Sequence, residues 1–387
     1  MKILQIHAQY TQTGGEEAVA QHEFDLLRQA GIDIRQFWLN NQSFVEDNSR
    51  LAIARKMIWN QDYRVNLEAA LAFKPDMVHI HNIFPAFSPV LYRYLQSKQF
   101  PMVQTLHNFR FLCANALFLR DAKPCERCLG KVLAYPAIQF GCYHNSRAQS
   151  AAVISMQKIH KLLGSFEAIT SYIALSEFAK TKFVDGGYPE DRIFVKPNFL
   201  PEDPGLGTHQ GNYALYVGRL SEEKGIEVLL EAWQQLELPI KLKIVGDGPL
   251  RHKVEKHSGD REFLGSQPKD QVLSLMKDAS LLIIPSLAYE NFPMTLVEAY
   301  ATGLPVVVSG HGSLAEWVKD GQTGWHFQAG SARSLAERLE QVWGHRDLIR
   351  ACGVAARHMY EERFQATVQV QQLLSIYNAT LARRGMA

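Results

Sequence analysis

Short apolar runs alternate with longer amphipathic segments along nearly the whole chain, a pattern typical of buried parallel strands separated by helices. One run is apolar at four consecutive positions, 281–284, which predicts a buried strand over 281–285. Such alternation places this chain in the α/β class, with two doubly wound parallel sheets. We expect strands at 2–8, 33–39, 76–82, 101–106, 167–175, 192–196, 213–217, 242–245, 262–264, 306–309 and 325–327, and helices before Gly31, over about 51–73, at 225–236, near 249–257, at 268–277 and at 294–302.

The length of 387 residues suits two domains of ordinary size. Proline and glycine are concentrated in 201–212, which indicates a linker. We therefore expect a first domain over 1–198, a linker at 199–212 and a second domain over 213–365. A last segment, 366–387, contains a helix over about 366–383 that we expect to return to the first domain. Because ligands of open parallel sheets bind at the carboxyl ends of strands, the expected ligand site is a cleft between the two domains.

Composition excludes several classes of protein. Hydrophobic residues make up 47% and charged residues 21% of the chain, which is typical of a globular protein and not of a disordered one. The net charge of +2 provides no field that would recruit nucleic acid. The first residues read as a strand and not as a signal peptide, and no apolar run reaches the length of a membrane span. We expect a cytoplasmic protein that would meet any lipid-borne partner at the membrane surface.

The stretch after the apolar run 281–284 is the strongest candidate for a binding site. Pro293 stands where a helix start tolerates proline, so the sequence predicts a strand, a loop and a helix N-terminus. The unpaired amides and positive dipole end of such a helix bind phosphate. Glu290 and Glu298 flank this point and are suited to accept hydrogen bonds from sugar hydroxyls. Alternatively, Glu290 is a solvated loop residue and Glu298 interacts only with the helix dipole.

Two other loops follow predicted strands of the second half. Arg219 and Lys224 lie in the loop that starts at Gly218, and both cations are suited to a diphosphate. The second loop, Gly246-Asp247-Gly248-Pro249, is a tight turn that would leave room for a flat ring. We find no Asp-x-Asp pair here that would hold a divalent ion, so the phosphate site is expected to need no metal.

Candidate groups in the first half also lie at strand ends. Gly14-Gly15 follows the first strand and would allow a ligand to approach the backbone, although Gly-Gly is also ordinary turn chemistry. The full dinucleotide-binding pattern Gly-x-Gly-x-x-Gly is missing, so NAD is not expected. His81 and His107 end two strands. We expect His81 to be a packed, hydrogen-bonded residue and His107 to be functional.

Residues 109–165 are rich in Lys, Arg and aromatic side chains and have few acidic ones. This segment either contacts an anionic membrane or acceptor, or is a solvated face over a small additional core. It also holds four of the five cysteines, including a Cys-x-x-Cys pair. Four thiolates are enough for a structural zinc, but free buried cysteines are common too. The candidate zinc ligands are Cys113, Cys125, Cys128 and Cys142.

Taken together, these motifs resemble family 4 of the retaining, nucleotide-sugar-dependent glycosyltransferases, which have the GT-B fold of two Rossmann-like domains. The resemblance covers most of the chain, including 76–81, His107 and Pro197-Asn198. Its specific part is a series of three motifs in order: Gly218-Arg219-Leu220 with Glu223-Lys224-Gly225, then 245–249, then Glu290 and Glu298.

The resemblance implies that Arg219 and Lys224 hold the donor diphosphate and that Glu298 binds the ribose. Glu290 and the amides after it would hold the transferred sugar and the phosphates. His107 looks like the family histidine that meets the sugar from the other domain; in many members Asp follows it, whereas this chain has Asn108. The implied catalytic residues are His107, Arg219, Lys224 and Glu290, and the implied donor-binding residues are Gly14, Gly15, Gly218, Arg219, Lys224, Gly246, Gly248, Pro249, Asn291, Phe292, Pro293, Met294, Thr295 and Glu298.

The segments 110–113, 119–121 and 124–128 look like a subgroup of bacterial surface-polysaccharide transferases. We therefore expect a metal-independent, retaining hexosyltransferase that moves a sugar from a UDP- or GDP-sugar to a hydroxyl of a glycan, expected to be lipid-linked. The N-terminal domain would bind the acceptor and the C-terminal domain the nucleotide sugar. Alternatives are another GT-B enzyme, such as a sugar-nucleotide epimerase or a phosphorylase, and a non-catalytic protein that binds sugar nucleotides.

Overall fold

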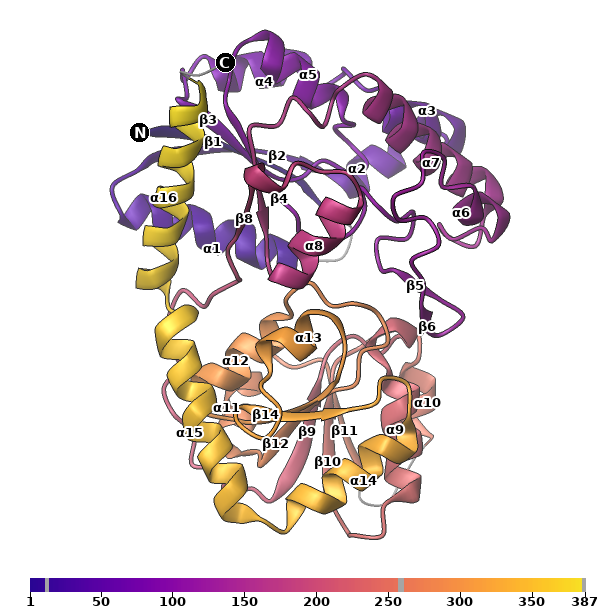
Figure 1. Cartoon of the computed structure of the whole chain (residues 1–387), viewed down its shortest axis with the longest axis vertical. Coiled ribbons are helices and arrows are strands. Elements are labelled where there is room, and N and C mark those ends of the chain that lie inside the picture. Colours follow the sequence, from indigo (N-terminus) through magenta and orange to yellow (C-terminus); the bar gives the residue numbers. More distant parts are fainter. Residues whose placement is uncertain (11–13, 257–260, 385–387) are drawn as a thin grey trace. The chain divides into compact units, whose positions relative to one another are not determined.

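A computed structural model of the chain describes residues 1–10, 14–256 and 261–384 (Figure 1). Backbone contacts divide the chain into two compact units. The first unit contains Met1–Ala116, Glu126–Pro197 and the chain from Ala366, and the second contains Leu117–Cys125 and Asn198–Gln365. Each unit has one six-stranded, all-parallel sheet, which confirms the predicted α/β fold of two doubly wound halves.

The sheet of the first unit has the strand order β2-β1-β3-β4-β7-β8. Its topological switch point lies between β1 and β3, because the chain leaves β1 for a strand on one side and then passes to the other side. Apolar side chains of β1, β3, β4 and β7 form a core with those of helix α16, which therefore packs on this sheet. The strands are β1 (Lys2–Gln9), β2 (Asp33–Asn40), β3 (Met77–Asn82), β4 (Met102–Thr105), β7 (Ser171–Ala174) and β8 (Ile193–Val195).

Helices surround this sheet, and every residue of β3 is buried, which explains its weak alternation of apolar and polar residues. Ser146 and Ser176 cap two of the helices by accepting hydrogen bonds from backbone amides. The helices of the first unit are α1 (Gly15–Gln29), α2 (Asn41–Glu46), α3 (Arg50–Ile58), α4 (Arg64–Leu71), α5 (Val90–Ser97), α6 (Tyr135–Gln139), α7 (Arg147–Leu162), α8 (Glu177–Asp185), the 3₁₀ turn η1 (Glu190–Arg192) and α16 (Ala366–Arg384).

The sheet of the second unit has the order β11-β10-β9-β12-β13-β14. Its switch point lies between β9 and β12, so the loops after these two strands leave the same edge of the sheet side by side. The elements are β9 (Tyr213–Val217), η2 (Glu222–Lys224), α9 (Ile226–Gln235), β10 (Lys241–Val245), α10 (Arg251–Glu255), β11 (Arg261–Gly265), α11 (Lys269–Asp278), β12 (Leu281–Ile284), α12 (Met294–Thr302), β13 (Val306–Ser309), α13 (Gly312–Trp317), β14 (Gly324–Phe327), α14 (Ala332–Trp343) and α15 (Arg346–Arg363).

A short arm from the first half of the sequence belongs to the second unit. It is a hairpin of β5 (Leu119–Arg120) and β6 (Lys123–Pro124). Leu119 is part of the core formed by β9, β12 and the surrounding helices. Phe118 is fully buried, and its ring centroid lies 6.2 Å from that of Tyr289. Phe118 and Leu119 therefore anchor this arm, which the sequence had placed in the first domain.

Two local details differ from what the sequence indicated. The helix expected over about 51–73 is broken into α3 and α4 at Asn60, whose side chain donates to the carbonyl of Ala86 (2.5 Å). The polar stretch 40–50 contains α2, because Asn40 caps it by accepting from the amide of Gln42. The helix expected near 249–257 is α10, and the end of that prediction, residue 257, lies outside the described residues, as do 385–387.

The expected linker lies against the second unit as an extended segment. The backbone amide of Gly207 donates to Thr302 (2.9 Å), and the ring of His209 bonds to the carbonyls of Ala279 and Thr302. Across the described ranges of the chain, no helix has both the length and the apolar composition needed to cross a bilayer.

Candidate functional site

The two loops at the switch point of the second unit are bound tightly to each other. The backbone amides of Leu287 and Ala288 both donate to the carbonyl of Glu223, at 2.9 and 3.2 Å. Gly225 has a left-handed φ of +69°, and a Cβ atom there would stand 1.9 Å from the carbonyl oxygen of Pro285. Only glycine fits this contact. The loop after β9 and the loop after β12 therefore form one surface at the carboxyl edge of the sheet.

An ion pair lies on this surface. Lys224 Nζ is 2.7 Å from Glu290 Oε1, and the hydroxyl of Ser286 donates to the same oxygen at 2.6 Å. Burial acts to raise the pKa of Glu290, but the charge and hydrogen bond of Lys224, with the Ser286 bond, leave that pKa below its usual value. Glu290 is therefore ionised at neutral pH. Its other oxygen, Oε2, has no hydrogen-bonding partner in the described part of the chain.

The same edge also carries a cation, a helix N-terminus and a second carboxyl group. Arg219 is exposed, and its carbonyl accepts a hydrogen bond from the Tyr216 hydroxyl (2.8 Å), which fixes the backbone but leaves the guanidinium in solvent. Pro293 is the N-cap of α12, so the amides at the start of this helix carry the positive end of its dipole. Glu298 is half-buried on α12, and burial raises its pKa to about 7.

The glycine turn after β10 packs on the loop after β9. A Cβ atom at Gly246 would lie 1.8 Å from the carbonyl oxygen of Gly218, and one at Gly248 would lie 2.5 Å from that of Leu220. The amide of Leu220 also donates to the carbonyl of Asp247 (2.9 Å). These glycines therefore make room for the chain's own backbone, a requirement that is independent of any ligand.

The residues after Glu290 are divided between the core and the surface. The side chain of Phe292 is buried against Trp317 and Phe364, with ring centroids 5.2 Å away from each. Its carbonyl accepts from the amide group of Asn198 (2.9 Å). A role of Phe292 in binding is thus restricted to its backbone, while Met294 and Thr295 at the start of α12 remain partly exposed.

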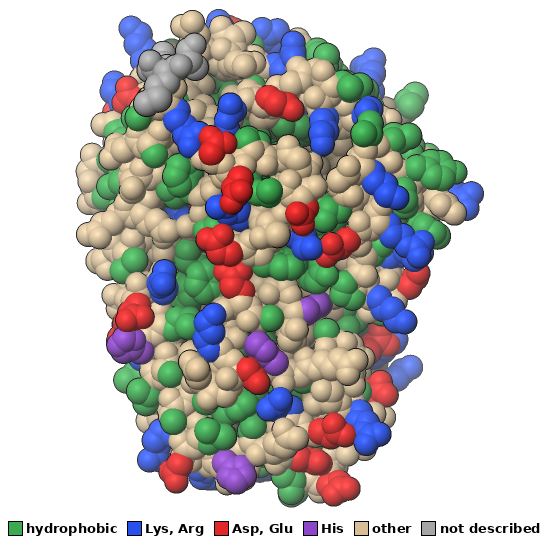
Figure 2. All heavy atoms as spheres, viewed as in Figure 1, with side chains coloured by type: hydrophobic (Ala, Val, Ile, Leu, Met, Phe, Trp, Pro, Cys, Tyr) green, Lys and Arg blue, Asp and Glu red, His purple; other side chains and the backbone are tan. Residues whose placement is uncertain are grey.

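A basic and apolar patch lies on the first unit, over α6, α7 and the loop before them. Figure 2 shows hydrophobic side chains beside Lys and Arg side chains over these helices. Leu162 is 72% exposed and Val132 is 73% exposed. The exposed members of this patch are Arg127, Lys131, Val132, Leu133, Tyr135, Phe140, Arg147, Lys161 and Leu162.

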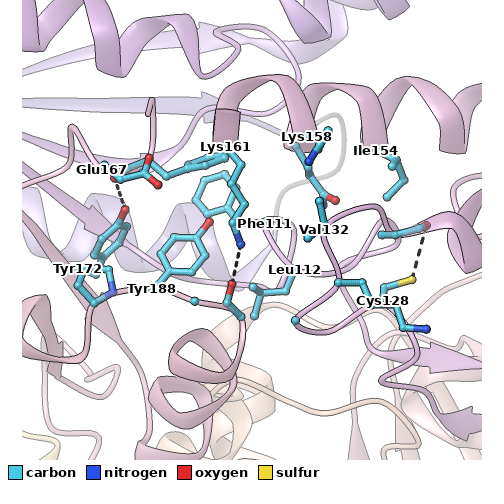
Figure 3. Close-up of a pocket in the computed structure, with 18 residues that line it drawn as sticks. Phe111, Leu112, Cys128, Val132, Ile154, Lys158, Lys161, Glu167, Tyr172 and Tyr188 are labelled. Carbon is cyan, nitrogen blue, oxygen red and sulfur yellow. Dashed lines mark hydrogen bonds between the residues drawn. The ribbon is translucent and has the colours of Figure 1, made fainter. Parts of the chain in front are cut away.

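A cavity of about 90 Å³ adjoins this patch (Figure 3). Lys158 and Val132 lie along it in Figure 3, and Lys161 donates to the carbonyl of Gly186 (3.1 Å). The Tyr172 hydroxyl, on the opposite wall, donates to the carbonyl of Phe166 (2.5 Å). The cavity thus combines lysines with aromatic walls.

The four candidate zinc cysteines are divided between the two units: Cys113, Cys128 and Cys142 belong to the first unit and Cys125 to the second. Among the residues with described positions, no group of three potential ligands within 4.8 Å of one another contains a cysteine. The thiol of Cys113 donates to the side chain of Asn115 (3.0 Å), and that of Cys128 lies 3.9 Å from the carbonyl of Ala134. The zinc site therefore stays a prediction from the spacing of the cysteines in the sequence.

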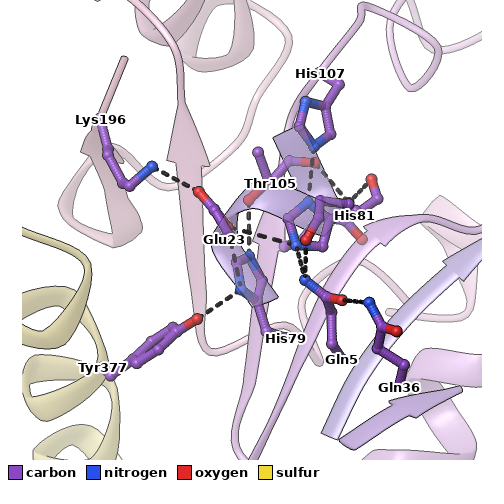
Figure 4. A network of polar contacts seen from close by, with 11 residues as sticks. Gln5, Glu23, Gln36, His79, His81, Thr105, His107, Lys196 and Tyr377 are labelled. Carbon is purple, nitrogen blue, oxygen red and sulfur yellow. Dashed lines mark hydrogen bonds and ion pairs between the residues drawn. The ribbon is translucent and has the colours of Figure 1, made fainter. Parts of the chain in front are cut away.

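Two histidines meet at the carboxyl edge of the first sheet (Figure 4). His81 Nδ1 lies 2.9 Å from His107 Nε2, and the rings are stacked with centroids 5.2 Å apart. His81 is buried and hydrogen-bonded, as its sequence position indicated, while His107 is partly exposed. The side-chain amide of Asn108 donates to the Tyr10 hydroxyl (3.1 Å).

The Gly14-Gly15 loop has an unexpected acidic environment. The amide of Gly14 donates to the carboxylate of Glu17 (2.7 Å), so it is already occupied. Glu16 lies 3.4 Å from the side-chain amide of Asn108, and burial raises the pKa of Glu16 to about 8. Sequence reasoning missed Glu16, although its position directly after two glycines at a strand end was a signal.

Comparisons with known proteins agree with the resemblance to glycosyltransferases seen in the sequence. The family model described as glycosyl transferases group 1 matches residues 203–359, which include both loops of the switch point in the second unit. Among curated relatives of this group 1 segment, the lipopolysaccharide 1,2-N-acetylglucosaminetransferase of Salmonella typhimurium is 35% identical over 40% of this chain. The amylovoran biosynthesis glycosyltransferase AmsK of Erwinia amylovora is 29% identical over 53% of this chain.

These matches span 42% and 55% of the two relatives' own lengths. The fold is similar over a longer range. The crystal structure of Anabaena Alr3699/HepE in complex with UDP superposes with a TM-score of 0.68, at 18% identity, and the match covers 98% of this chain and 100% of that one. This chain therefore has the GT-B fold.

Proposed function

We propose that this protein is a glycosyltransferase that moves a sugar from a nucleotide diphosphate to an acceptor hydroxyl with retention of the anomeric configuration. The observation that carries the proposal is the switch point of the second unit. There, the Lys224–Glu290 pair joins two loops beside the N-terminus of α12. Cations next to helix amides suit a diphosphate, and a fixed carboxylate suits sugar hydroxyls.

The donor diphosphate would be held without a metal ion. Arg219 and Lys224 supply positive charge, and the first amides of α12 supply hydrogen bonds to the phosphate oxygens. Together they stabilise the charge that develops on the leaving diphosphate. Glu298 accepts hydrogen bonds from the ribose hydroxyls. A UDP- or GDP-sugar fits this scheme, and UDP is favoured because the Anabaena protein of the same fold was crystallised with UDP-glucose.

Glu290 acts in this proposal as a positioning group for the sugar and not as a nucleophile. Its Oε1 atom is bound by Lys224 and Ser286, which leaves Oε2 for a sugar hydroxyl. The departing phosphate then takes the proton of the attacking acceptor hydroxyl on the same face of the sugar. His107, by the family resemblance, contacts the transferred sugar.

The acceptor in this proposal is a lipid-linked glycan used in cell-surface polysaccharide synthesis. Two relatives named for lipopolysaccharide and amylovoran biosynthesis support this class of acceptor. The patch over α6 and α7 would bring the protein to the inner face of the membrane, with Val132 and Leu162 inserted among lipids and Lys131 and Arg147 near anionic headgroups.

Labelled UDP- and GDP-sugars, incubated with and without a lipid-diphosphate sugar, test the activity. The proposal expects transfer that depends on the acceptor, survives EDTA and yields the donor's anomeric configuration by NMR. Arg219→Gln should weaken nucleotide binding, whereas Arg333→Gln is a matched control because Arg333 is exposed and pairs with Glu337 on the same helix. Turnover without an acceptor would indicate an epimerase, and a requirement for free phosphate would indicate a phosphorylase. Binding of sugar nucleotide with no reaction would leave only a binding protein.

The membrane contact has a separate test. Vesicles of phosphatidylglycerol should sediment the protein, and vesicles of phosphatidylcholine should do so much less. Replacing Leu162 and Val132 by Ser should reduce sedimentation without loss of UDP binding, because both residues lie in the first unit. Equal sedimentation by the wild type and this variant would refute the contact.

A further inference from the structure

A buried polar network extends inward from His107 in the first unit (Figure 4). His81 and His79 alternate along β3 and are both almost fully buried. His79 bonds to the hydroxyls of Tyr377 (2.7 Å) and Thr105 (2.8 Å). Burying polar groups costs folding free energy, so a buried polar network of this size indicates a specific role.

The network is not arranged for a metal ion. Glu23, His79 and His81 offer ligand atoms within 4.8 Å of one another. However, Lys196 Nζ lies 2.6 Å from Glu23 Oε1, and both side chains are almost fully buried. The ammonium group already supplies the positive charge that the carboxylate needs, and a second cation would be repelled. The role of the network must therefore lie in its hydrogen bonds.

The direction of these bonds is fixed by Gln5. Its Nε2 atom lies 2.8 Å from the carbonyl oxygen of Ala20, which can only accept, so this atom is the amide nitrogen. Gln36 donates to the other end of the same amide, Gln5 Oε1, at 3.0 Å. The same Gln5 nitrogen lies 3.1 Å from His81 Nε2. His81 Nε2 must therefore accept, and its proton belongs on Nδ1.

The tautomer of His81 then determines the tautomer of His107. Burial, followed by the nearby histidines, lowers the pKa of His81 well below its usual value. Burial likewise lowers the pKa of His107. Each ring is neutral and carries one proton. His81 Nδ1–H donates to His107 Nε2 across 2.9 Å, so the proton of His107 must be on Nδ1.

We propose that His81 is a positioning residue that holds His107 in its Nδ1–H tautomer, so that His107 presents a hydrogen-bond donor to an oxygen of the bound sugar. This inference rests on the proposed function for its ligand. It assigns a definite role to each ring nitrogen: Nε2 is occupied by His81, and Nδ1 has no partner among the described residues. His107 therefore donates a hydrogen bond and does not serve as a general base.

One neighbour would favour the opposite arrangement. Glu23 Oε2 lies 3.5 Å from His81 Nε2. If that nitrogen carried the proton and donated to Glu23, His81 Nδ1 would accept and His107 would be protonated on Nε2. The distance is longer than an ordinary hydrogen bond, whereas the Gln5 contact is within range. The two arrangements predict opposite tautomers of His107.

The tautomer can be read directly from ring nitrogen shifts in NMR of the ¹⁵N-histidine-labelled protein, with His107 assigned by its own replacement. The proposal expects a pyrrole-type signal for Nδ1 and a pyridine-type signal for Nε2. His81→Asn keeps a donor at the position of Nδ1 and should preserve this pattern. His81→Phe keeps the ring but no donor, and should leave His107 as a mixture of tautomers. An Nε2–H signal in the wild type would overturn the proposal.

His79→Gln provides a matched control, because His79 is equally buried on the same strand but makes no hydrogen bond to His107. This variant should not change the His107 signals even if its melting temperature falls. A change of tautomer in His79→Gln as large as that in His81→Phe would reduce the role of His81 to general packing and refute the assignment.

Activity provides the second readout. His81→Phe should lower kcat for sugar transfer by about 100-fold, as expected for loss of an aligned donor, while His81→Asn retains most of it. UDP affinity should be unchanged in both, since the proposed nucleotide site lies in the other unit. Equal kcat in all three proteins would refute the role in catalysis. If the wild type neither binds nor turns over sugar nucleotides, the proposed function fails, but the NMR result still decides the tautomer.

Discussion

Replacing Lys224 and replacing Glu290 should have unequal effects on the stability of the second unit. The atoms are 2.7 Å apart, which at an effective dielectric constant of about 20 corresponds to an attraction of about 6 kcal/mol before desolvation is subtracted. The side chain of Lys224 is 33% exposed and that of Glu290 is 14% exposed. Glu290→Gln therefore leaves a lysine that can turn to water, whereas Lys224→Met leaves a carboxylate that cannot.

We expect Lys224→Met to destabilise the second unit by about 2–4 kcal/mol, near the range for breaking a buried pair. Glu290→Gln should cost about 1 kcal/mol or less, as for a surface pair. Thermal denaturation resolves this difference, because about 1 kcal/mol shifts the midpoint of such a domain by about 2–4 °C. The double variant should be less destabilised than the sum of the two single variants, since it removes the pair as a whole.

The sign of the pH dependence follows from the same contact. Lys224 and Ser286 lower the pKa of Glu290 despite burial, so the stabilisation is present above the unfolded pKa and is lost as pH falls through the folded pKa. In Lys224→Met, burial acts without the lysine and raises that pKa. The two proteins should therefore differ most in stability near pH 7 and less near pH 4.

Glu290→Gln should be the more stable of the two single variants and should still lose most of its turnover. Glu290→Gln removes the carboxylate that positions the sugar, so turnover should fall by about 100-fold or more while UDP binding is retained. Equal melting temperatures for the two single variants would refute the reasoning from exposure. Turnover of Glu290→Gln close to that of the wild type would remove Glu290 from the site.

Three shorter predictions follow. Burial raises the pKa of Glu298 to about 7, so stability should fall as pH rises from 4.5 to 7, and Glu298→Gln should flatten this slope in melting curves. If Glu298 binds ribose, UDP affinity measured by calorimetry should rise over the same interval. Gly246→Ala should lower stability by at least about 2 kcal/mol in a urea titration, since its Cβ would meet a carbonyl at 1.8 Å; Gly344→Ala, with open space around it, is the control. Phe118→Ala should destabilise the second unit by about 3–5 kcal/mol, which proteolysis of that unit would detect.

The sheets could be predicted from sequence because their strands are buried on both faces. Runs such as β12 and β13 contain almost only branched apolar residues, and both were placed within one residue of their bounds. Strand order was not predictable in the same way, since it depends on pairings between distant segments. Alternation of strand and helix indicated two doubly wound sheets but not the positions of their switch points.

Loops were harder to predict, because their conformation depends on contacts with other segments. Residues 117–125 begin with three apolar residues and continue with polar ones, and their place in the second unit rests on the burial of Phe118 and Leu119. The contacts of the Cys113 thiol with Asn115 and of the Cys128 thiol with Ala134 were likewise not predictable from the spacing of the cysteines. The partner of Lys224 was equally hidden, since Glu290 lies 66 residues away.

The two sheet edges differ in charge, and this difference divides the chemistry between them. The switch point of the second unit carries Arg219 and Lys224, whereas at that of the first unit Glu17 already occupies the amide of Gly14 and Glu16 lies close by. A diphosphate is therefore attracted to the switch point of the second unit. The donor-binding role that the family resemblance implies for Gly14 stays a prediction, and its amide is already bonded to Glu17. Neutral rings suit hydroxyls, so we expect the first unit to contact the sugar through His107, while the second unit holds the phosphates and, through Glu290, also contacts the sugar.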